Sequence, residues 1–188
     1  GQYPCQIRRS FVRKSQARNL VQAALLAAVT AVLSQIQLSI GPVPFNLAVL
    51  GAYLAGMLMT PGWALVSLTV YMMLGLVGVP VFAGMMAGPA VLFGQTGGYV
   101  IGYIAIAGVT AAARQWNKPA VTALGMAVGL ILCYGFGTAW FMVVTGNSLA
   151  QSLAWCVTPF VLPDVCKAAC AYALGRMLER RMAKAGLL

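Results

Sequence analysis

The chain consists largely of six apolar stretches, each close to the length of a helix that crosses a bilayer. Of its 188 residues, 61% are hydrophobic and 7% are charged, which leaves too little polar surface to cover a soluble domain of this size. A helical span needs about 20 apolar residues, and the alternating pattern of a membrane β-barrel is missing. We therefore predict an all-α, polytopic integral membrane protein with six transmembrane helices. The predicted spans are residues 20–40, 45–60, 63–79, 97–113, 121–145 and 163–182.

The basic residues predict how these helices are oriented. Of the twelve Lys and Arg residues, all but Lys167 lie in the N-terminal segment, in the loop between the fourth and fifth spans, or towards the C-terminal end. The loops on the opposite side contain none, and Lys and Arg are typically enriched in cytoplasmic loops. Both termini are therefore predicted to be cytoplasmic. The predicted organisation is a basic cytoplasmic segment at 1–19, a six-helix membrane domain at 20–182 and a cytoplasmic tail at 183–188.

Two segments between the spans are apolar but irregular. Residues 80–96 contain several Gly and Pro residues, and irregular backbone at membrane depth must be buried in protein or line a cavity. We expect this segment to fold back over the outer mouth of the helix bundle as a lid. Residues 150–162 contain Pro159 and precede Pro163, so a continuous helix through both prolines is not expected. Pro163 instead suits the first turn of the last helix.

The chain has two acidic residues, and one of them, Asp164, lies in an apolar stretch three positions before Lys167. Ionisable residues at membrane depth are costly, so this pair indicates a functional site. If Pro163 begins the last helix, Asp164 lies at the positive end of the helix dipole and Lys167 lies one turn further on the same face. In the functional interpretation, Lys167 attracts an anionic ligand while Asp164 accepts hydrogen bonds from it or orients the ammonium. The alternative is a Lys that snorkels to the outer interface beside a helix-capping Asp.

Several kinds of function lack the residues that they need. The sequence has no His, and its five Cys form no CxxC unit, so no metal site is expected. A Ser, Thr or Cys nucleophile would have no base beside it and no P-loop motif occurs, so we predict neither an enzyme nor a cofactor. The basic residues flank helices without interleaved aromatic residues, which argues against a nucleic-acid partner. The Cys residues, interpreted as small packing residues, are Cys5, Cys133, Cys156, Cys166 and Cys170.

Small residues recur every four positions in three of the predicted helices, and this spacing favours close contact between helices. In the first span the repeat suits either a partner helix or packing within the chain. In the fourth and fifth spans we interpret it as internal contact. The repeats are Ala23, Ala27 and Ala31, then Gly98 and Gly102, then Gly125 and Gly129.

Four motifs follow one another along residues 20–176: IGPVPFNLAVLGAYLAG, LGLVGVPVFAG, LFGQTGGYVIGY and LPDVCK. Together they resemble the BioY family, the biotin-binding S components of energy-coupling factor (ECF) transporters. The resemblance implies a six-helix protein that captures biotin from outside and docks onto a shared module of one transmembrane T protein and two ATPases. It also implies a multi-pass protein of the bacterial inner (plasma) membrane, with biotin as the transported ligand.

The resemblance implies roles for individual residues as well. The family's Asp and Lys at the start of the last helix match Asp164 and Lys167, so Lys167 is expected to hold the carboxylate of biotin. Asp164, with Asn46 or Gln95, is expected to meet polar atoms of the ligand. The expected apolar wall is formed by Tyr99, Phe82 and Phe93. The residues expected to dock the T protein are Ala23, Ala27 and Ala31.

Departures from the family pattern keep other functions open. Ala48 stands where the family often has Gln, Gln95 replaces a Pro, and AGMMAG replaces a polar, Gly-dense loop. An S component for another small vitamin is therefore the first alternative. A facilitator or secondary transporter that acts alone is the second, and an intramembrane enzyme or a scaffold is the third.

Overall fold

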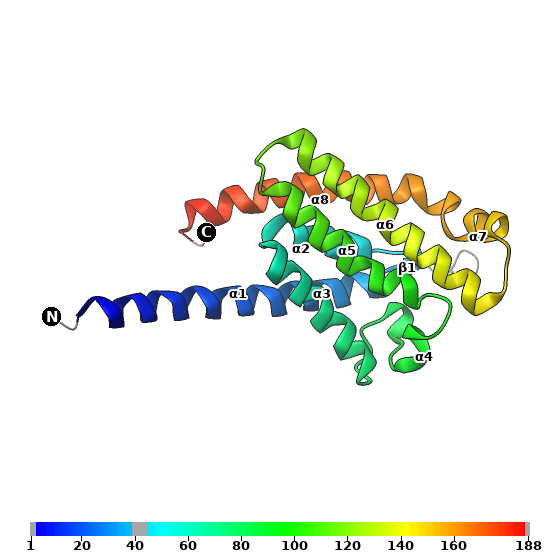
Figure 1. Ribbon diagram of the computed structural model, residues 1–188, viewed down its shortest axis with the longest axis horizontal. Coiled ribbons are helices and arrows are strands. Elements are labelled where there is room, and N and C mark those ends of the chain that lie inside the picture. The colour runs from blue at the N-terminus through cyan, green and yellow to red at the C-terminus, as the bar shows by residue number, and fades with distance from the viewer. Residues whose placement is uncertain (1–2, 39–44, 187–188) are drawn as a thin grey trace.

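The computed structural model describes residues 3–38 and 45–186, and these are almost entirely helical (Figure 1), which confirms the all-α prediction. The longer helices are α1 (Tyr3–Gln35), α2 (Ala48–Leu58), α3 (Pro61–Leu76), α5 (Gly97–Arg114), α6 (Pro119–Thr145) and α8 (Thr158–Lys184). The shorter elements are β1 (Gln37–Leu38), β2 (Phe45–Asn46), the 3-10 turn η1 (Ala83–Met85), α4 (Pro89–Leu92) and α7 (Leu149–Cys156).

Length and composition indicate which helices can cross a membrane. Among the described residues, α6 and the Ser15–Gln35 part of α1 are long and apolar enough, and the bent pair of α7 and α8 gives up to a third span. Helix α2 has 11 residues and α3 has 16, fewer than the ~20 that cross a bilayer as a straight helix. The chain is thus an α-helical membrane protein, while the six-span topology stays a prediction. The predicted end of the first span, at residues 39–40, lies outside the described residues.

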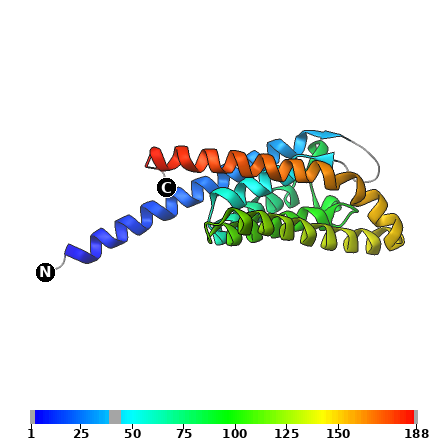
Figure 2. The same ribbon diagram turned by 90° about the horizontal axis from the view of Figure 1, so that it is seen from above.

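Both ends of the described chain lie towards the same end of the bundle (Figure 1). The N-terminal part of α1 projects beyond the other helices (Figure 2), and neither α1 nor α8 is interrupted at the predicted domain boundaries. Near this end, the Glu179 carboxylate forms ion pairs with Arg114 and Arg176. Arg114 and Arg176 thus lie together at the end of the bundle that holds both termini. The side of the membrane that this end faces stays a prediction.

Helix α5 is the centre of the packing, because it contacts α6, α2 and α3. Its glycines allow the closest approach, as predicted. A Cβ added at Gly102 would lie 2.6 Å from Sγ of Cys133, and one added at Gly98 would lie 2.4 Å from Cβ of Trp140. Gly129 of α6 meets the backbone of Ile106 in the same way. The small residues of α5 and α6 thus serve internal contacts.

The alanine repeat of α1 also serves internal packing. Ala23 and Ala27 are each 1% exposed, and Ala31 is half-buried against the same core. Helix α1 packs here on α2 and α3, and Ser67 of α3 donates a hydrogen bond of 2.8 Å to the carbonyl of Ala23. These alanines are therefore covered by the chain's own helices in this structure, and their part in docking a partner stays a prediction. Their small side chains allow α2 and α3 to approach α1.

The segment 80–96 folds onto the end of the bundle, as predicted, and is attached on both sides. Gln35, in the last turn of α1, donates to the carbonyl of Phe82 at 3.0 Å and accepts from the amide of Met85 at 2.9 Å. The amide of Gly88 donates to the carbonyl of Gly75 in α3 at 2.7 Å. The Phe82 ring lies against Gly75, where any side chain would collide with it. The segment is thus placed to cover the space between α1 and α3, and its movement as a lid stays a prediction.

The chain bends before the last helix, but not where the prolines predicted. Helices α7 and α8 meet at Val157 with an angle of 42°. Helix α8 then begins at Thr158, holds Pro159 in its first turn and continues through Pro163. The prediction that Pro163 begins the helix is therefore wrong. Pro159 needs no partner for an N–H in the first turn, and one missing hydrogen bond at Pro163 is tolerated by the long helix. Asp164 consequently lies in the second turn.

Candidate functional site

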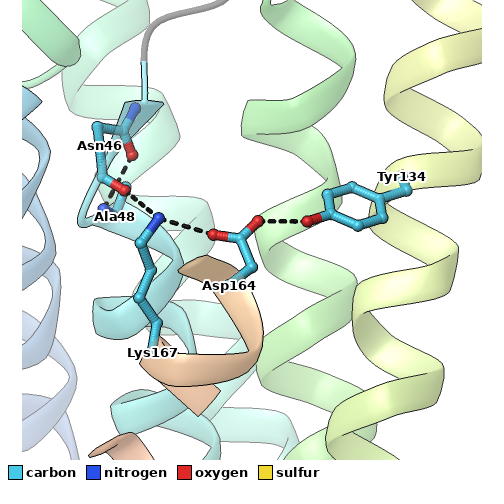
Figure 3. Close-up of polar contacts among 5 residues, drawn as sticks. All are labelled: Asn46, Ala48, Tyr134, Asp164 and Lys167. Atoms are coloured by element: carbon cyan, nitrogen blue, oxygen red, sulfur yellow. Dashed lines mark hydrogen bonds and ion pairs between the residues drawn. The ribbon is translucent and has the colours of Figure 1, made fainter. Parts of the chain in front are cut away.

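Asp164 and Lys167 form a buried ion pair on α8 (Figure 3). The Nζ atom of Lys167 lies 2.7 Å from Oδ1 of Asp164, and the two side chains are 7% and 4% exposed. Neither side chain reaches out to an interface, so the snorkelling alternative does not describe this structure. In a low-dielectric interior, each charge depends on the other for compensation.

The ammonium of Lys167 has two further contacts, both with strand β2. Nζ donates a 2.6 Å hydrogen bond to the backbone carbonyl of Asn46 and lies 3.8 Å from the centre of the Phe45 ring. The second contact is a cation–π interaction. Strand β2 pairs with β1, which follows α1, so the N-terminal half of the chain holds the Lys167 ammonium in place. The Asn46 side chain itself accepts from the amide of Ala48 at 2.9 Å and fixes the start of α2 (Figure 3).

The Asp164 carboxylate has a second donor, the hydroxyl of Tyr134 on α6. This O–H group donates to Oδ2 of Asp164 at 2.6 Å, while Oδ1 accepts from Lys167 (Figure 3). A continuous series of hydrogen bonds thus joins α6, α8 and β2. These linked hydrogen bonds hold the Lys167 ammonium in one position.

The polar series forms one wall of a cavity of about 40 Å³. A second cavity of about 30 Å³ lies below the segment 80–96. Asn46, Tyr99 and Tyr103 line both cavities and therefore separate them. Each cavity is smaller than the ~300–1,000 Å³ of typical small-molecule sites, so only displacement of the side chains between them would join the two into a site of that size. The two cavities together run from the ion pair to the covering segment.

Most of the residues predicted for the site meet at these cavities. Asp164 and Lys167 line the larger cavity, Phe82 lines the smaller one, and Asn46 and Tyr99 line both. The hydroxyl of Tyr99 is 3.1 Å from Oγ1 of Thr138, so its ring is held by a contact to α6.

Two predicted site residues lie elsewhere. Phe93 is 69% exposed and Gln95 is exposed, and neither lines a cavity. Helix α4 ends at Leu92, and its inward face carries Val91 and Leu92. The turn that follows α4 directs Phe93 and Gln95 away from the bundle. In this structure neither side chain contacts the cavities, so their part in binding stays a prediction, and Thr96 is the polar residue of this turn that lines the smaller cavity.

Several residues of the site were not predicted from the sequence. Tyr103 lies four positions after Tyr99 on α5, and this spacing places both rings on one face of the helix. Phe45 directly precedes Asn46, so it could also have been found. Tyr134 carried no local signal, because it lies within the apolar sequence of α6 and meets Asp164 only in the folded structure.

No group of three or more His, Cys, Asp or Glu side chains lies close enough to hold a metal ion in the described part of the chain. Cys133 and Cys156 are buried and line the larger cavity, whereas Cys166 and Cys170 are exposed. The site therefore offers charge, hydrogen bonds and aromatic surface. These are the means of binding a small polar ligand.

Fold and site together define an α-helical integral membrane protein with a buried ion pair that lines a small cavity. The sequence matches the BioY family over residues 8–184. The chain therefore belongs to the BioY family.

Individual relatives agree with this membership over nearly their whole lengths. The chain is 37% identical over 164 residues to a probable biotin transporter BioY of Pyrococcus horikoshii, covering 87% of this chain and 98% of the relative. It is 30% identical over 166 residues to the biotin transporter BioY of Thermotoga maritima, covering 87% and 96%. Among solved structures, the S-component for biotin from an ECF-type ABC transporter has the same fold. The TM-score is 0.81 at 23% identity, covering 89% of this chain and 93% of that one.

Proposed function

We propose that the chain is the biotin-binding S component of an ECF transporter. It captures biotin from outside the cell and delivers it through an ATPase-driven module of one transmembrane T protein and two ATPase subunits. The observation that carries this proposal is the buried Asp164–Lys167 pair, which lines a cavity in a chain with one other acidic residue, Glu179. The family membership and the names of the relatives support biotin as the ligand.

The geometry assigns different tasks to the two charged residues. Their charged atoms are 2.7 Å apart, whereas the carboxylate and the ureido ring of biotin lie at opposite ends of the molecule. One extended ligand therefore cannot place its carboxylate on Lys167 and its ureido ring on Asp164. Lys167 binds the carboxylate, because an ammonium has three N–H donors and two of them are used by protein acceptors. Asp164, held by Tyr134, orients Lys167.

The ring end of biotin then lies towards the second cavity. This cavity combines aromatic walls from Tyr71, Phe82 and Tyr99 with the polar side chains of Asn46 and Thr96. Aromatic surface suits the fused rings, and the polar groups suit the ureido N–H and C=O. The segment 80–96 acts as the lid, since it forms the outer wall of the cavity that the rings enter.

Membrane topology and partners belong to the same proposal. Helices α1 and α6 and the bent pair of α7 and α8 cross the bacterial inner membrane, the shorter α2, α3 and α5 complete the six-helix membrane domain, and both termini lie in the cytoplasm. The positive charge at the end of the bundle that holds both termini supports this orientation. The chain itself carries no ATP-binding P-loop, so the energy for release comes from the ATPase subunits.

Two of the three departures from the family pattern lie outside the candidate site, and the third lies at its wall. Gln95 is exposed, and Ala48 is fully buried at the start of α2 without lining either cavity. The third difference, AGMMAG, contributes Ala83 and Met86 to the wall of the second cavity, so an S component for another small vitamin stays an alternative. A transporter that acts alone is a further alternative, and uptake of biotin into vesicles that lack any ATPase would support it.

Titration calorimetry with biotin and its methyl ester tests the proposal, because the ester lacks the carboxylate. Lys167→Met is expected to weaken biotin binding at least ~tenfold, the effect of losing one charge-assisted hydrogen bond. The same substitution should change binding of the ester much less. The matched control is Lys184→Met, which removes an exposed Lys at the far end of α8. Equal losses for both ligands would show that Lys167 does not bind the carboxylate, and unchanged biotin affinity would remove the site.

A further inference from the structure

A wide apolar groove opens between α6 and α8, with a volume of about 810 Å³. Several residues of its two walls are alanines, whose short side chains leave the space between α6 and α8 open. Tyr53 of α2 lines the groove, and its hydroxyl donates a hydrogen bond to the carbonyl of Met126. Tyr134 also lines the groove, and its hydroxyl donates to Asp164. The groove therefore offers almost purely hydrocarbon surface. The small residues of its two walls are Ala123 and Ala127 on α6 and Ala168 and Ala169 on α8.

The rim of the groove faces the surroundings with large apolar side chains. Ile131 of α6 is 67% exposed, and Val165 of α8 is 53% exposed. In an integral membrane protein, such a surface lies against lipid acyl chains. The stretch of α6 from Pro119 to Ile131 rises about 18 Å at the ~1.5 Å per residue of an α-helix. This length matches the ~15 Å that the chains of one leaflet occupy in a ~30 Å hydrocarbon core.

One end of the groove meets a cationic pocket. This pocket shares Pro119 and Tyr172 with the groove and is also lined by Arg114, Lys118 and Arg176. The single carboxylate of Glu179 pairs with both arginines, and no ion pair of Lys118 occurs among the described residues, so three cations stand against one acidic group. Nε of Arg114 is buried and has no hydrogen-bond partner among the described residues. The pocket thus has both excess positive charge and an unused donor.

We propose that the groove and the pocket bind one anionic phospholipid. The phosphate of the headgroup lies between Arg114, Lys118 and Arg176, and one acyl chain fills the groove between α6 and α8. Basic pockets between transmembrane helices recognise anionic headgroups in this way, and guanidinium groups bind phosphate through charge-assisted hydrogen bonds. The pocket lies where α5 ends and α6 begins, so the phosphate is at the depth of the membrane interface while the chain points into the hydrocarbon core. This proposal does not depend on the transported ligand.

Native mass spectrometry of the purified full chain tests the proposal, with phosphatidylglycerol and phosphatidylcholine of identical acyl chains as probes. Phosphatidylglycerol should remain bound to a larger fraction of the protein than phosphatidylcholine. Lys118→Gln should weaken phosphatidylglycerol binding about fivefold, the effect of one basic residue near an anionic headgroup. Arg18→Gln, which removes one exposed charge from α1, is the matched control and should have no effect. Equal binding of the two lipids would overturn the assignment of the headgroup.

The acyl chain is tested by filling the groove. Ala127→Phe should weaken binding of both lipids, whereas Ala139→Phe, at an exposed position of α6 outside the groove, should leave it unchanged. Ala169→Phe fills the groove from the opposite wall, so the test holds if one variant does not fold. Glycerophosphate, which has no acyl chain, should compete weakly. The proposal is overturned if the variants with a filled groove still bind the lipid. It is also overturned if the mass spectra show that the groove of the unsubstituted protein holds a second protein chain and not a lipid.

Discussion

The buried ion pair allows a quantitative test by double substitution. Lys167→Met leaves the Asp164 carboxylate, 4% exposed, with the Tyr134 hydroxyl as its remaining donor. Removing one partner of a buried pair typically costs ~3–5 kcal/mol of unfolding free energy, and the Tyr134 hydrogen bond places the expected cost near the lower value. Asp164→Asn should cost a similar amount. The double variant removes both charges and should recover at least ~2 kcal/mol relative to the sum of the single losses.

The measurement is the unfolding of purified protein in mixed micelles, followed by loss of helicity as a denaturing detergent is added. The same helix supplies the control, because Arg176 and Glu179 form a second pair with the same i,i+3 spacing but with side chains 41% and 22% exposed. Its coupling energy should stay below ~1 kcal/mol, as for exposed pairs. Additive losses at Asp164 and Lys167 would refute the view that burial makes these charges interdependent.

Three further predictions concern single contacts. Tyr134→Phe removes one donor from the buried carboxylate and should lower the unfolding free energy by ~1–3 kcal/mol in the same detergent titration; no loss would mean that the hydrogen bond is replaced. Gly102→Ala places a Cβ 2.6 Å from Sγ of Cys133 and should cost ~1–3 kcal/mol, with partial recovery by Cys133→Ala, and failure of this recovery would argue against the steric cause. Phe93→Ala and Gln95→Ala should leave biotin affinity by calorimetry unchanged, since both residues lie outside the cavities, and a tenfold loss at either would revise the site.

The helices were predictable from the sequence wherever an apolar stretch is bounded by clear breaks. The predicted spans 97–113 and 121–145 correspond closely to α5 and α6, because Gly97 and Pro119 mark helix starts and Gly146 marks an end. The span predicted at 45–60 was too long, because its first residues form strand β2 and α2 begins only at Ala48. Apolar composition alone does not distinguish a short strand from the first turn of a helix.

The charged residues of the candidate site could be predicted from the sequence, whereas residues whose position depends on the orientation of their side chains could not. Asp164 and Lys167 could be identified because a charge within an apolar sequence has few explanations. The exposure of Phe93 could not be predicted, because it depends on the turn after α4, which no local pattern specifies. The alanines of α1 show the same limit, since small-residue spacing indicates close contact but does not say with which helix.

The hydrogen bond from Lys167 to the backbone carbonyl of Asn46 restricts the movement of strand β2. No side-chain substitution at this position can delete an acceptor that every amino acid carries. The paired strands β1 and β2 are thereby held in place by Lys167, which lies 121 positions after Asn46 in the chain. Any displacement of these strands separates the Asn46 carbonyl from the Lys167 ammonium, so moving them costs electrostatic energy. In the proposed binding mode the ligand carboxylate takes the third N–H of Lys167, so capture of the anion leaves this contact with strand β2 in place.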